Sequence, residues 1–312
     1  MKNASQKEII LVALGGNALI GKGQAGTIEE QLENLRVPVR QIARLSRNYR
    51  IIITHGNGPQ VGNLLLQQES CGEVPRMPLE ILVAQTQGQI GYMIESTLDS
   101  ELMKAGIGGK FLVSLISYVV VDEKDPAFQD PTKPIGPVYT EEEAARAVFP
   151  VRMTLKGYRR VVASPRPVTI VEKREIKKLI DMDFIVICCG GGGIPVIREG
   201  RAFQGVDAVI DKDLASARLA EEVGADIFII ATDVFGAALN FGLPEQVFLR
   251  SVTLDEASGY LAKGHFLSGS MGPKVEAAVQ FMRCGGKRAV ITSVDRIEEA
   301  VAGRAGTEFR RE

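Results

Sequence analysis

The chain has 312 residues, a formal net charge of −1 and a hydrophobic content of 45%. The near-neutral balance, without any block of like charge, argues against nonspecific nucleic-acid binding, and the apolar runs are too short to cross a membrane. Four cysteines without C-x-x-C spacing and two histidines argue against a zinc knuckle, a disulfide framework or a multi-histidine metal site, so we expect reduced thiols in a cytoplasmic protein.

Short β-branched runs alternate with longer helical patterns along the chain. Thr27 and Glu30 predict a capping box before a helix that Pro38 should kink or end. Helical patterns also cover Leu64–Gln68 and Leu79–Lys104. The runs that predict strands are Ile9–Leu14, Ile51–Thr54, Phe111–Val121, Phe184–Cys189, Asp226–Thr232 and Arg288–Thr292. This alternation predicts an α/β fold with a mostly parallel sheet covered on both faces.

Two segments interrupt the alternation. Asp122–Pro137 contains four prolines, too many for a helix or a central strand. We interpret it as part of a protruding lid over about residues 122–160 rather than as a disordered linker, because long ordered loops usually serve a site. The second break, around Asp211–Leu214, starts a helix that leads into the C-terminal third. We therefore predict two lobes, residues 1–213 and residues 214–312.

Three glycine segments directly follow predicted strands: Gly15–Asn17, His55–Asn63 and Cys189–Pro195. Such turns leave backbone N–H groups at the N-terminus of a helix, where they bind anions. Turn geometry explains the first segment as well as function does, but the four consecutive glycines of the third exceed what reversing a chain needs. Because the carboxyl ends of parallel strands share one edge of a sheet, the three segments are predicted to line one crevice.

The second segment also resembles a relaxed dinucleotide-binding fingerprint, through Gly56, Gly58 and Gly62. That fingerprint needs an acidic residue at the end of a second strand about twenty residues later, where this chain has a helical pattern. No G-x-x-x-x-G-K-[ST] motif is present, so a P-loop is excluded. A nicotinamide-dependent oxidoreductase is therefore a distant alternative.

Three lysines stand beside glycine-rich or acidic breaks in the chain. Lys212 lies between two aspartates, either in a surface ion pair or aimed by one carboxylate, and we favour the second interpretation. Lys274 follows a Gly-Pro pair suited to a first helical turn, and Lys133 lies among the prolines of the lid. Mobile positive charge and free N–H groups are what phosphoryl transfer requires, so the sequence predicts a phosphotransferase. No base is needed, and His55 is interpreted as structural.

These motifs resemble those of the carbamate kinases, which have the amino-acid kinase fold. The matching segments follow the family's order from about Ile9 to Gly306: VALGGNAL, HGNGPQVGNLLLQQ, TQGQIGYM, DPAFQDPTKPIGPVYTEEEA, RRVVASPRP, CGGGGIPV, AVIDKDLAS and GSMGPK. The resemblance implies a homodimer of three-layer αβα sandwiches, each with two lobes and a small protruding subdomain. It also implies magnesium-dependent phosphoryl transfer between ATP and carbamate, giving ADP and carbamoyl phosphate and usually run towards ATP in arginine breakdown.

The resemblance also implies roles for individual residues. The lobe of residues 1–213 would hold carbamate or carbamoyl phosphate, and the lobe of residues 214–312 the nucleotide. The catalytic residues would be Lys133, Lys212, Asp213 and Lys274, with Asp213 orienting the last two lysines. The residues around carbamate and the phosphoryl group would be Gly15, Gly16, Asn17, Gly56, Asn57, Gly58, Gly191 and Gly192. The nucleotide would contact Lys212, Thr232, Asp233, Gly269, Met271 and Lys274, and Mg²⁺ would be held mainly by phosphate oxygens and water.

One stretch departs from the family's usual T-x-V-D-x-V-Y-x-N-F/Y-G pattern, because this chain reads TDVFGAALNFG. Phe235 replaces the acid, and Ala237 and Ala238 replace the valine and the tyrosine. We therefore expect an altered nucleotide affinity or base selectivity.

Two other functions stay open from the sequence. Another acid kinase of this fold would need an added cation for the distal carboxylate of its acceptor, and no extra arginine for this role stands out in the matched motifs. A nucleotide-binding regulator that has lost catalysis is opposed by the joint presence of the catalytic lysines and Asp213, while Phe235 keeps it open.

Overall fold

The computed structural model describes residues 7–154, 157–266 and 270–312. Within them, the main sheet has eight strands in the order β15-β17-β16-β12-β1-β2-β9-β3. Neighbouring strands are parallel except for the antiparallel pair β16 and β17. The strand bounds are β1 Ile9–Leu14, β2 Arg50–His55, β3 Leu112–Ser114, β9 Ile185–Ile187, β12 Ile227–Thr232, β15 Ser251–Thr253, β16 Arg288–Ser293 and β17 Thr307–Arg310. The predicted α/β fold with a mostly parallel sheet is confirmed.

Helices connect these strands, as the alternating pattern predicts. Their bounds are α1 Ile28–Leu45, α2 Gly58–Ser70, α3 Leu79–Lys104, α4 Glu141–Arg146, α5 Lys173–Asp181, α6 Lys212–Val223, α7 Leu254–Ala262, α8 Met271–Arg283 and α9 Ile297–Val301, with short 3₁₀ turns η2 Gly16–Ala18, η3 Pro126–Phe128 and η4 Gly190–Gly192. Thr27 and Glu30 form the predicted capping box, and α3 has the predicted bounds. Of the two outcomes expected for Pro38, an end of the helix is wrong, because α1 continues to Leu45 with Val39 and Ile42 buried beyond the proline, and a kink stays a prediction.

The main sheet is buried on both faces, as the alternation of side chains along β1 shows. Ile9, Leu11 and Ala13 pack in a core with residues of α5, α6 and α8. The residues between them, such as Ile10 and Val12, pack in a second core with residues of α1, α3 and α9. Strand side chains alternate between faces, so each central strand contributes to both cores and the molecule is a three-layer αβα sandwich.

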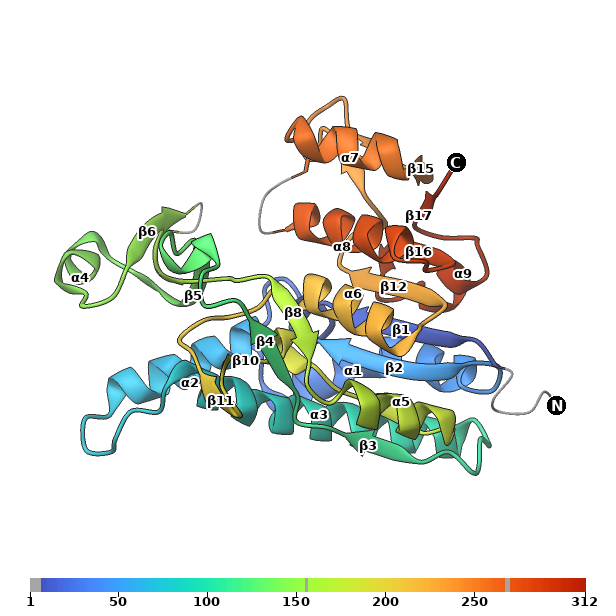
Figure 1. Ribbon diagram of the computed structural model, residues 1–312, viewed down its shortest axis with the longest axis horizontal. Coiled ribbons are helices and arrows are strands. Elements are labelled where there is room, and N and C mark those ends of the chain that lie inside the picture. The colour runs from blue at the N-terminus through green and yellow to red at the C-terminus, as the bar shows by residue number, and fades with distance from the viewer. Residues whose placement is uncertain (1–6, 155–156, 267–269) are drawn as a thin grey trace.

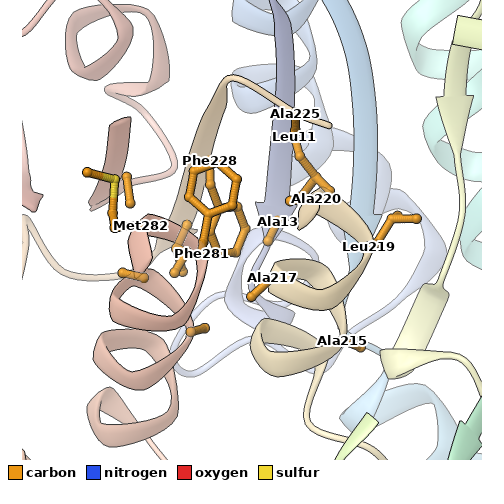
Figure 2. Close-up of a cluster of buried hydrophobic side chains, with 14 of the residues drawn as sticks. Leu11, Ala13, Ala215, Ala217, Leu219, Ala220, Ala225, Phe228, Phe281 and Met282 are labelled. Atoms are coloured by element: carbon orange, nitrogen blue, oxygen red, sulfur yellow. The ribbon is translucent and has the colours of Figure 1, made fainter. Parts of the chain in front are cut away.

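The core between α6, α8 and the sheet combines large and small side chains (Figure 2). The rings of Phe228 on β12 and Phe281 on α8 meet edge to face, with centroids 5.5 Å apart. Ala217 and Ala220 on α6 are fully buried. Their short side chains let α6 lie close against the sheet, which places the N-terminus of α6 near the carboxyl end of β1.

The predicted strand Phe111–Val121 is wrong as a single element. It divides into β3 and β4 (Tyr118–Val121), which belong to different sheets. Between them, the buried amide of Gln87 accepts from the backbone N–H of Ser117 at 2.9 Å and donates to its carbonyl oxygen at 3.2 Å. This side chain from α3 therefore pairs both backbone groups of Ser117 at the point where the chain leaves the main sheet.

Smaller sheets hold the remaining strands. Their bounds are β10 Ile194–Glu199, β11 Ala202–Gly205 and β8 Pro167–Ile170 beside β4, then β5 Lys133–Tyr139, β6 Val151–Thr154 and β7 Gly157–Val162, and the pair β13 Ala238–Leu239 and β14 Val247–Phe248. β5, α4 and β6 extend away from the main sheet (Figure 1). β5 is an edge strand in the order β5-β7-β6, the position in a sheet that tolerates its prolines.

Helix α6 begins at Lys212, and the carboxylate of Asp211 caps it by accepting from the N–H of Asp213 at 2.9 Å. The predicted helix start around Asp211–Leu214 is therefore confirmed, whereas a division into two lobes there stays a prediction. Over the described residues, we find no helix whose length and apolar character would allow it to span a membrane.

Candidate active site

A cavity of about 530 Å³ lies at the carboxyl ends of the central strands. Each predicted glycine segment contributes to it: Gly16 follows β1, Gly56 to Gly58 follow β2, and Gly191 follows β9. Lys133, Lys212 and Lys274 line the same cavity. The predicted convergence of glycine segments and lysines on one crevice is present, at the edge where parallel sheets bind ligands.

The four-glycine run is required by close approach. Gly191 has a φ of +67°, and a Cβ there would lie 2.1 Å from Nδ2 of Asn57. Gly192 has a φ of +90°, and a Cβ there would lie 2.2 Å from the carbonyl oxygen of Ile210. Both the left-handed backbone and the lack of space exclude other residues. The run therefore brings the segment after β9 against the segments that carry Asn57 and Asp211.

The structure separates the predicted glycine ligands into two groups. Gly15 donates its N–H to Ala231 at 2.9 Å, and Gly192 donates to Cys189 at 3.1 Å. Among the described residues, neither is part of the lining of the large cavity, whereas Gly16, Asn57, Gly58 and Gly191 are. Gly56 lines the cavity but donates its N–H to Leu14 at 3.0 Å. Asn17 is the second residue of η2. The N–H groups of Gly15, Gly56 and Gly192 thus belong to internal backbone hydrogen bonds.

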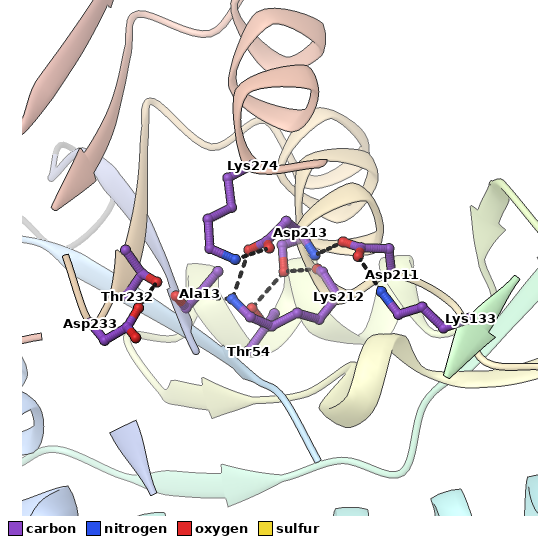
Figure 3. Close-up of polar contacts among 10 residues, drawn as sticks. Ala13, Thr54, Lys133, Asp211, Lys212, Asp213, Thr232, Asp233 and Lys274 are labelled. Carbon is purple, nitrogen blue, oxygen red and sulfur yellow. Dashed lines mark hydrogen bonds and ion pairs between the residues drawn. The ribbon is translucent and has the colours of Figure 1, made fainter. Parts of the chain in front are cut away.

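Asp213 connects two of the lysines (Figure 3). Its Oδ1 lies 2.7 Å from Nζ of Lys212, and its Oδ2 lies 3.0 Å from Nζ of Lys274. Lys212 also donates to the carbonyl oxygen of Ala13, at 3.4 Å. The Asp213 side chain is only 3% exposed, so solvent screens these contacts weakly. One carboxylate thus fixes two ammonium groups that lie 62 residues apart in the sequence.

Burial and charge have opposite effects on these groups. Burial would raise the pKa of Asp213, but the positive charges of Lys212 and Lys274 lower it to about 2. Burial lowers the pKa of Lys212, and the carboxylate of Asp213 opposes this. Burial also acts to lower the pKa of Lys274, but Asp213 outweighs it and the pKa is raised. The site therefore holds Asp213 as a carboxylate and Lys274 as an ammonium at neutral pH.

Asp211 pairs with Lys133 rather than with its neighbour in the sequence. Its Oδ2 lies 2.9 Å from Nζ of Lys133, while its Oδ1 caps α6 (Figure 3). Lys133 is the first residue of β5. This ion pair therefore joins the protruding segment, which we define as the sheet of β5, β7 and β6 with α4, to the start of α6. The two aspartates around Lys212 consequently serve different lysines.

A second cavity, of about 110 Å³, adjoins the first at Lys274, which lines both. Its other lining residues are Thr232, Asp233, Val234, Ala238, Phe241, His265, Phe266, Ser270 and Met271. Three of the predicted nucleotide contacts, Thr232, Asp233 and Met271, are therefore neighbours in space. Lys212 lies in the large cavity instead, and the predicted contact Gly269 lies outside the described residues.

The residues that depart from the family pattern lie at different depths. Ala238 lines the second cavity, and Ala237 is fully buried in the core. Phe235 is not part of that lining among the described residues. Its ring packs against Phe248, with centroids 6.0 Å apart, and under the guanidinium of Arg296. Of the three, Ala238 is thus the residue that lines the same cavity as the predicted nucleotide contacts Thr232, Asp233 and Met271.

The sequence interpretation missed Arg159 as a cavity residue. Arg159 lies on β7 and lines the large cavity. Arg159 opens the segment RRVVASPRP, so the matched motifs do contain an arginine that lines this cavity, and whether it serves the distal carboxylate of another acceptor stays untested. That segment carried a signal, but only the folded chain shows which of its two adjacent arginines faces the cavity.

His55 is structural, as expected. It is buried at the end of β2, and its Nδ1 lies 3.1 Å from the carbonyl oxygen of Gly56. Because the partner is a carbonyl, Nδ1 carries the proton and donates it. Burial lowers the pKa of His55 to about 4, with the charge of Lys212 acting in the same direction and the bond to Gly56 opposing them. His55 is therefore neutral at physiological pH.

We expect His55 to make stability depend on pH between about pH 4 and 6.5. In this window the unfolded chain binds a proton on His55 and the folded chain does not, so the free energy of unfolding falls as the pH falls. Between pH 7 and pH 4.5 a His55→Gln variant should lose about 2–3 kcal/mol less than the wild type. Urea unfolding at both pH values measures the difference. The exposed His265→Gln is the control, and equal losses in wild type and His55→Gln would contradict the expectation.

The described residues contain no group of three or more His, Cys, Asp or Glu side chains arranged to hold a metal ion. The carboxylates of Asp211 and Asp213, which line the large cavity, are paired with lysines. The arrangement fits a metal that arrives on phosphate oxygens better than one held by protein carboxylates.

Comparisons with known proteins agree with this geometry. The model of the amino acid kinase family matches residues 8–293. The carbamate kinase of Thermococcus kodakarensis is 50% identical over 313 residues, covering 97% of this chain and 99% of that protein. The carbamate kinase of Haemophilus influenzae is 49% identical over 303 residues, covering 96% and 95%. The structure of carbamate kinase from Giardia lamblia bound to AMP-PNP has a TM-score of 0.90 and 41% identity, covering 98% of this chain and 99% of that one.

The chain belongs to the amino acid kinase family. Its similarity to these relatives, 41–50% identity over nearly the whole chain, places it among the carbamate kinases within that family.

Proposed function

We propose that the protein catalyses reversible phosphoryl transfer between ATP and carbamate, giving ADP and carbamoyl phosphate. The observation that carries this proposal is the gathering of Lys133, Lys212 and Lys274 around one glycine-lined cavity. A transferring phosphoryl group spreads negative charge over its oxygens, and positioned positive charges stabilise it. The similar Giardia lamblia carbamate kinase, solved with AMP-PNP, supports a nucleotide as one substrate.

The two cavities suggest how the substrates divide. We assign carbamate or carbamoyl phosphate to the large cavity, formed mainly by the proposed lobe of residues 1–213. We assign ATP or ADP to the second cavity, formed by the proposed lobe of residues 214–312. Lys274 lines both cavities, so the transferring phosphoryl group belongs beside it. In this arrangement Gly16, Asn57, Gly58 and Gly191 surround the carbamate end.

Charge stabilisation is the main contribution of the chain to the reaction. Asp213 holds Lys212 and Lys274 in place before substrate binds, so little reorganisation is needed during transfer. Lys133 approaches from the protruding segment and is held by Asp211. The carbamate oxygen is already an anion and attacks without a general base, which agrees with a neutral, buried His55. Mg²⁺ bound to the nucleotide would neutralise charge on its phosphates.

A coupled assay tests the proposal. ATP formation is measured from ADP and carbamoyl phosphate, with acetyl phosphate and aspartyl phosphate as alternative donors and with Lys133→Ala as a variant. We expect ATP from carbamoyl phosphate, much less from the other donors, and a large loss in Lys133→Ala. ATP from aspartyl phosphate alone would indicate another acid kinase. Nucleotide binding without ATP from any donor would indicate a regulator.

Three further predictions depend on the family resemblance. We propose a homodimeric assembly, a cytoplasmic location and a role in generating ATP during arginine breakdown. Sedimentation of the purified chain at the mass of a monomer would contradict the first of these.

A further inference from the structure

The large cavity contains a cation that the proposed chemistry has not used. The Arg159 side chain lines it from β7, and its Nη2 donates to the carbonyl oxygen of Gly136 on β5 at 2.8 Å. Lys133 lies on the same strand as Gly136. Arg159 thus belongs to the protruding segment and faces the same space as Lys133.

Arg159 has no carboxylate partner among the described residues, unlike each of the three lysines of the cavity. Its Nε is buried and makes no hydrogen bond. A guanidinium has five N–H donors, and a single carbonyl satisfies only one of them. Burial lowers the pKa of Arg159, but an arginine stays charged at neutral pH. Arg159 is half-buried and faces the cavity, so an anion bound there would complete N–H donors that the protein leaves open.

The charges around the cavity leave an excess of positive charge. Lys133, Arg159, Lys212 and Lys274 contribute four positive charges, and Asp211 and Asp213 contribute two negative charges, which gives a net +2 (4 − 2) for this lining. A fully ionised acyl phosphate carries two negative charges. Without Arg159 the lining would carry only +1, so Arg159 completes the match to such a dianion.

We propose that Arg159 is a substrate-binding residue that engages the anionic end of carbamoyl phosphate, or the carboxylate of carbamate in the opposite direction. This inference rests on the proposed function. The planar guanidinium of Arg159 presents parallel N–H donors. These match two oxygens of a carboxylate or a phosphate better than the single ammonium of a lysine does. Arg159 binds the phosphoryl donor, carbamoyl phosphate, rather than the nucleotide, because it lines the large cavity and not the second cavity.

Arg160 provides a matched control. It is the next residue on β7, but its Nη2 lies 3.1 Å from Oδ2 of Asp207 and its guanidinium lies over the ring of Phe149. It is not part of the lining of the large cavity among the described residues. A variant at Arg160 therefore removes an arginine from the same strand without removing a cation from the cavity.

Steady-state ATP formation from ADP and carbamoyl phosphate tests the proposal in the wild type, Arg159→Gln, Arg159→Lys and Arg160→Gln. We expect Arg159→Gln to raise the KM for carbamoyl phosphate about 10- to 100-fold, with the KM for ADP changed less than about twofold. Arg159→Lys should fall between wild type and Arg159→Gln, because it keeps the charge without the fork. Arg160→Gln should leave both KM values within about twofold of the wild type.

A structural role for Arg159 would give a different result. If the residue only holds β5 through Gly136, the variant should lose thermal stability and change both KM values together, which would overturn the proposal. An unchanged KM for carbamoyl phosphate in folded Arg159→Gln would also overturn it. Stabilisation by ADP in a thermal melt shows whether Arg159→Gln is folded, and Arg159→Lys decides the matter if it is not. Failure of the proposed function would appear separately, as a wild type that forms no ATP.

Discussion

Replacing Lys212 with methionine is expected to lower kcat for ATP formation by about 10²–10³ while leaving ADP binding nearly intact. The ammonium of Lys212 is held between Asp213 and the carbonyl oxygen of Ala13, at the carboxyl end of β1. Methionine fills most of the space of the lysine stem but removes the charge that we propose stabilises the transferring phosphoryl group. Because Lys212 is absent from the second cavity, the loss should affect the rate more than nucleotide affinity.

Initial rates of ATP formation give kcat, and calorimetric titration with ADP gives the affinity for the nucleotide. Lys173→Met is a suitable control, because Lys173 also pairs with a carboxylate, Glu222, but is outside the lining of both cavities among the described residues. We expect its kcat to stay within about twofold of the wild type. An active Lys212→Met variant with a normal kcat would remove Lys212 from the proposed chemistry.

Replacing Asp213 with asparagine is expected to lower kcat by at least about 10², although Asp213 itself need not touch substrate. Both Lys212 and Lys274 would lose their shared partner, and each would then face the other's charge without compensation. An amide is close in shape to the carboxylate, so the fold should persist. The ion pairs that orient both lysine side chains would be lost.

The pH profile of Asp213→Asn gives a second readout. Burial already lowers the pKa of Lys212, and the carboxylate is what opposes it. Without that carboxylate the pKa falls further, so more of Lys212 loses its proton as the pH rises. The variant should therefore lose rate with rising pH in a range where the wild type stays flat. Glu221→Gln, which changes a carboxylate on the same helix that pairs with Arg218, should show neither effect. A flat profile with normal kcat in Asp213→Asn would contradict the prediction.

Several features of the fold and of the site were predictable because they depend on residues close together in the sequence. The strand Ile9–Leu14, the capping box of Thr27 and Glu30 and the helix Leu79–Lys104 follow from local hydrophobic periodicity and end signals. The placement of glycine segments directly after strands also follows from local pattern, and parallel topology then brings them to one edge.

Other features depended on contacts between distant segments. Gln87 on α3 divides the predicted strand at Ser117, and no local pattern around Ser117 announces that partner. Pro38 costs a hydrogen bond within α1, but the helix continues because residues on both sides of the proline are buried. Arg159 and Arg160 look equivalent in the sequence, and only the folded chain shows that Arg159 lines the cavity while Arg160 pairs with Asp207.

The sequence by itself determined the alternating α/β pattern, the three glycine segments and the three lysines of the proposed phosphoryl transfer, because periodicity, capping and turn chemistry act over a few residues. The family resemblance implied that Asp213 orients Lys212 and Lys274, and the structure has both ion pairs. Only the tertiary structure decided that Asp211 pairs with Lys133, 78 residues away in the sequence. Ion pairs depend on distances of about 3 Å that packing sets, and adjacency in the chain does not determine which carboxylate a buried ammonium meets.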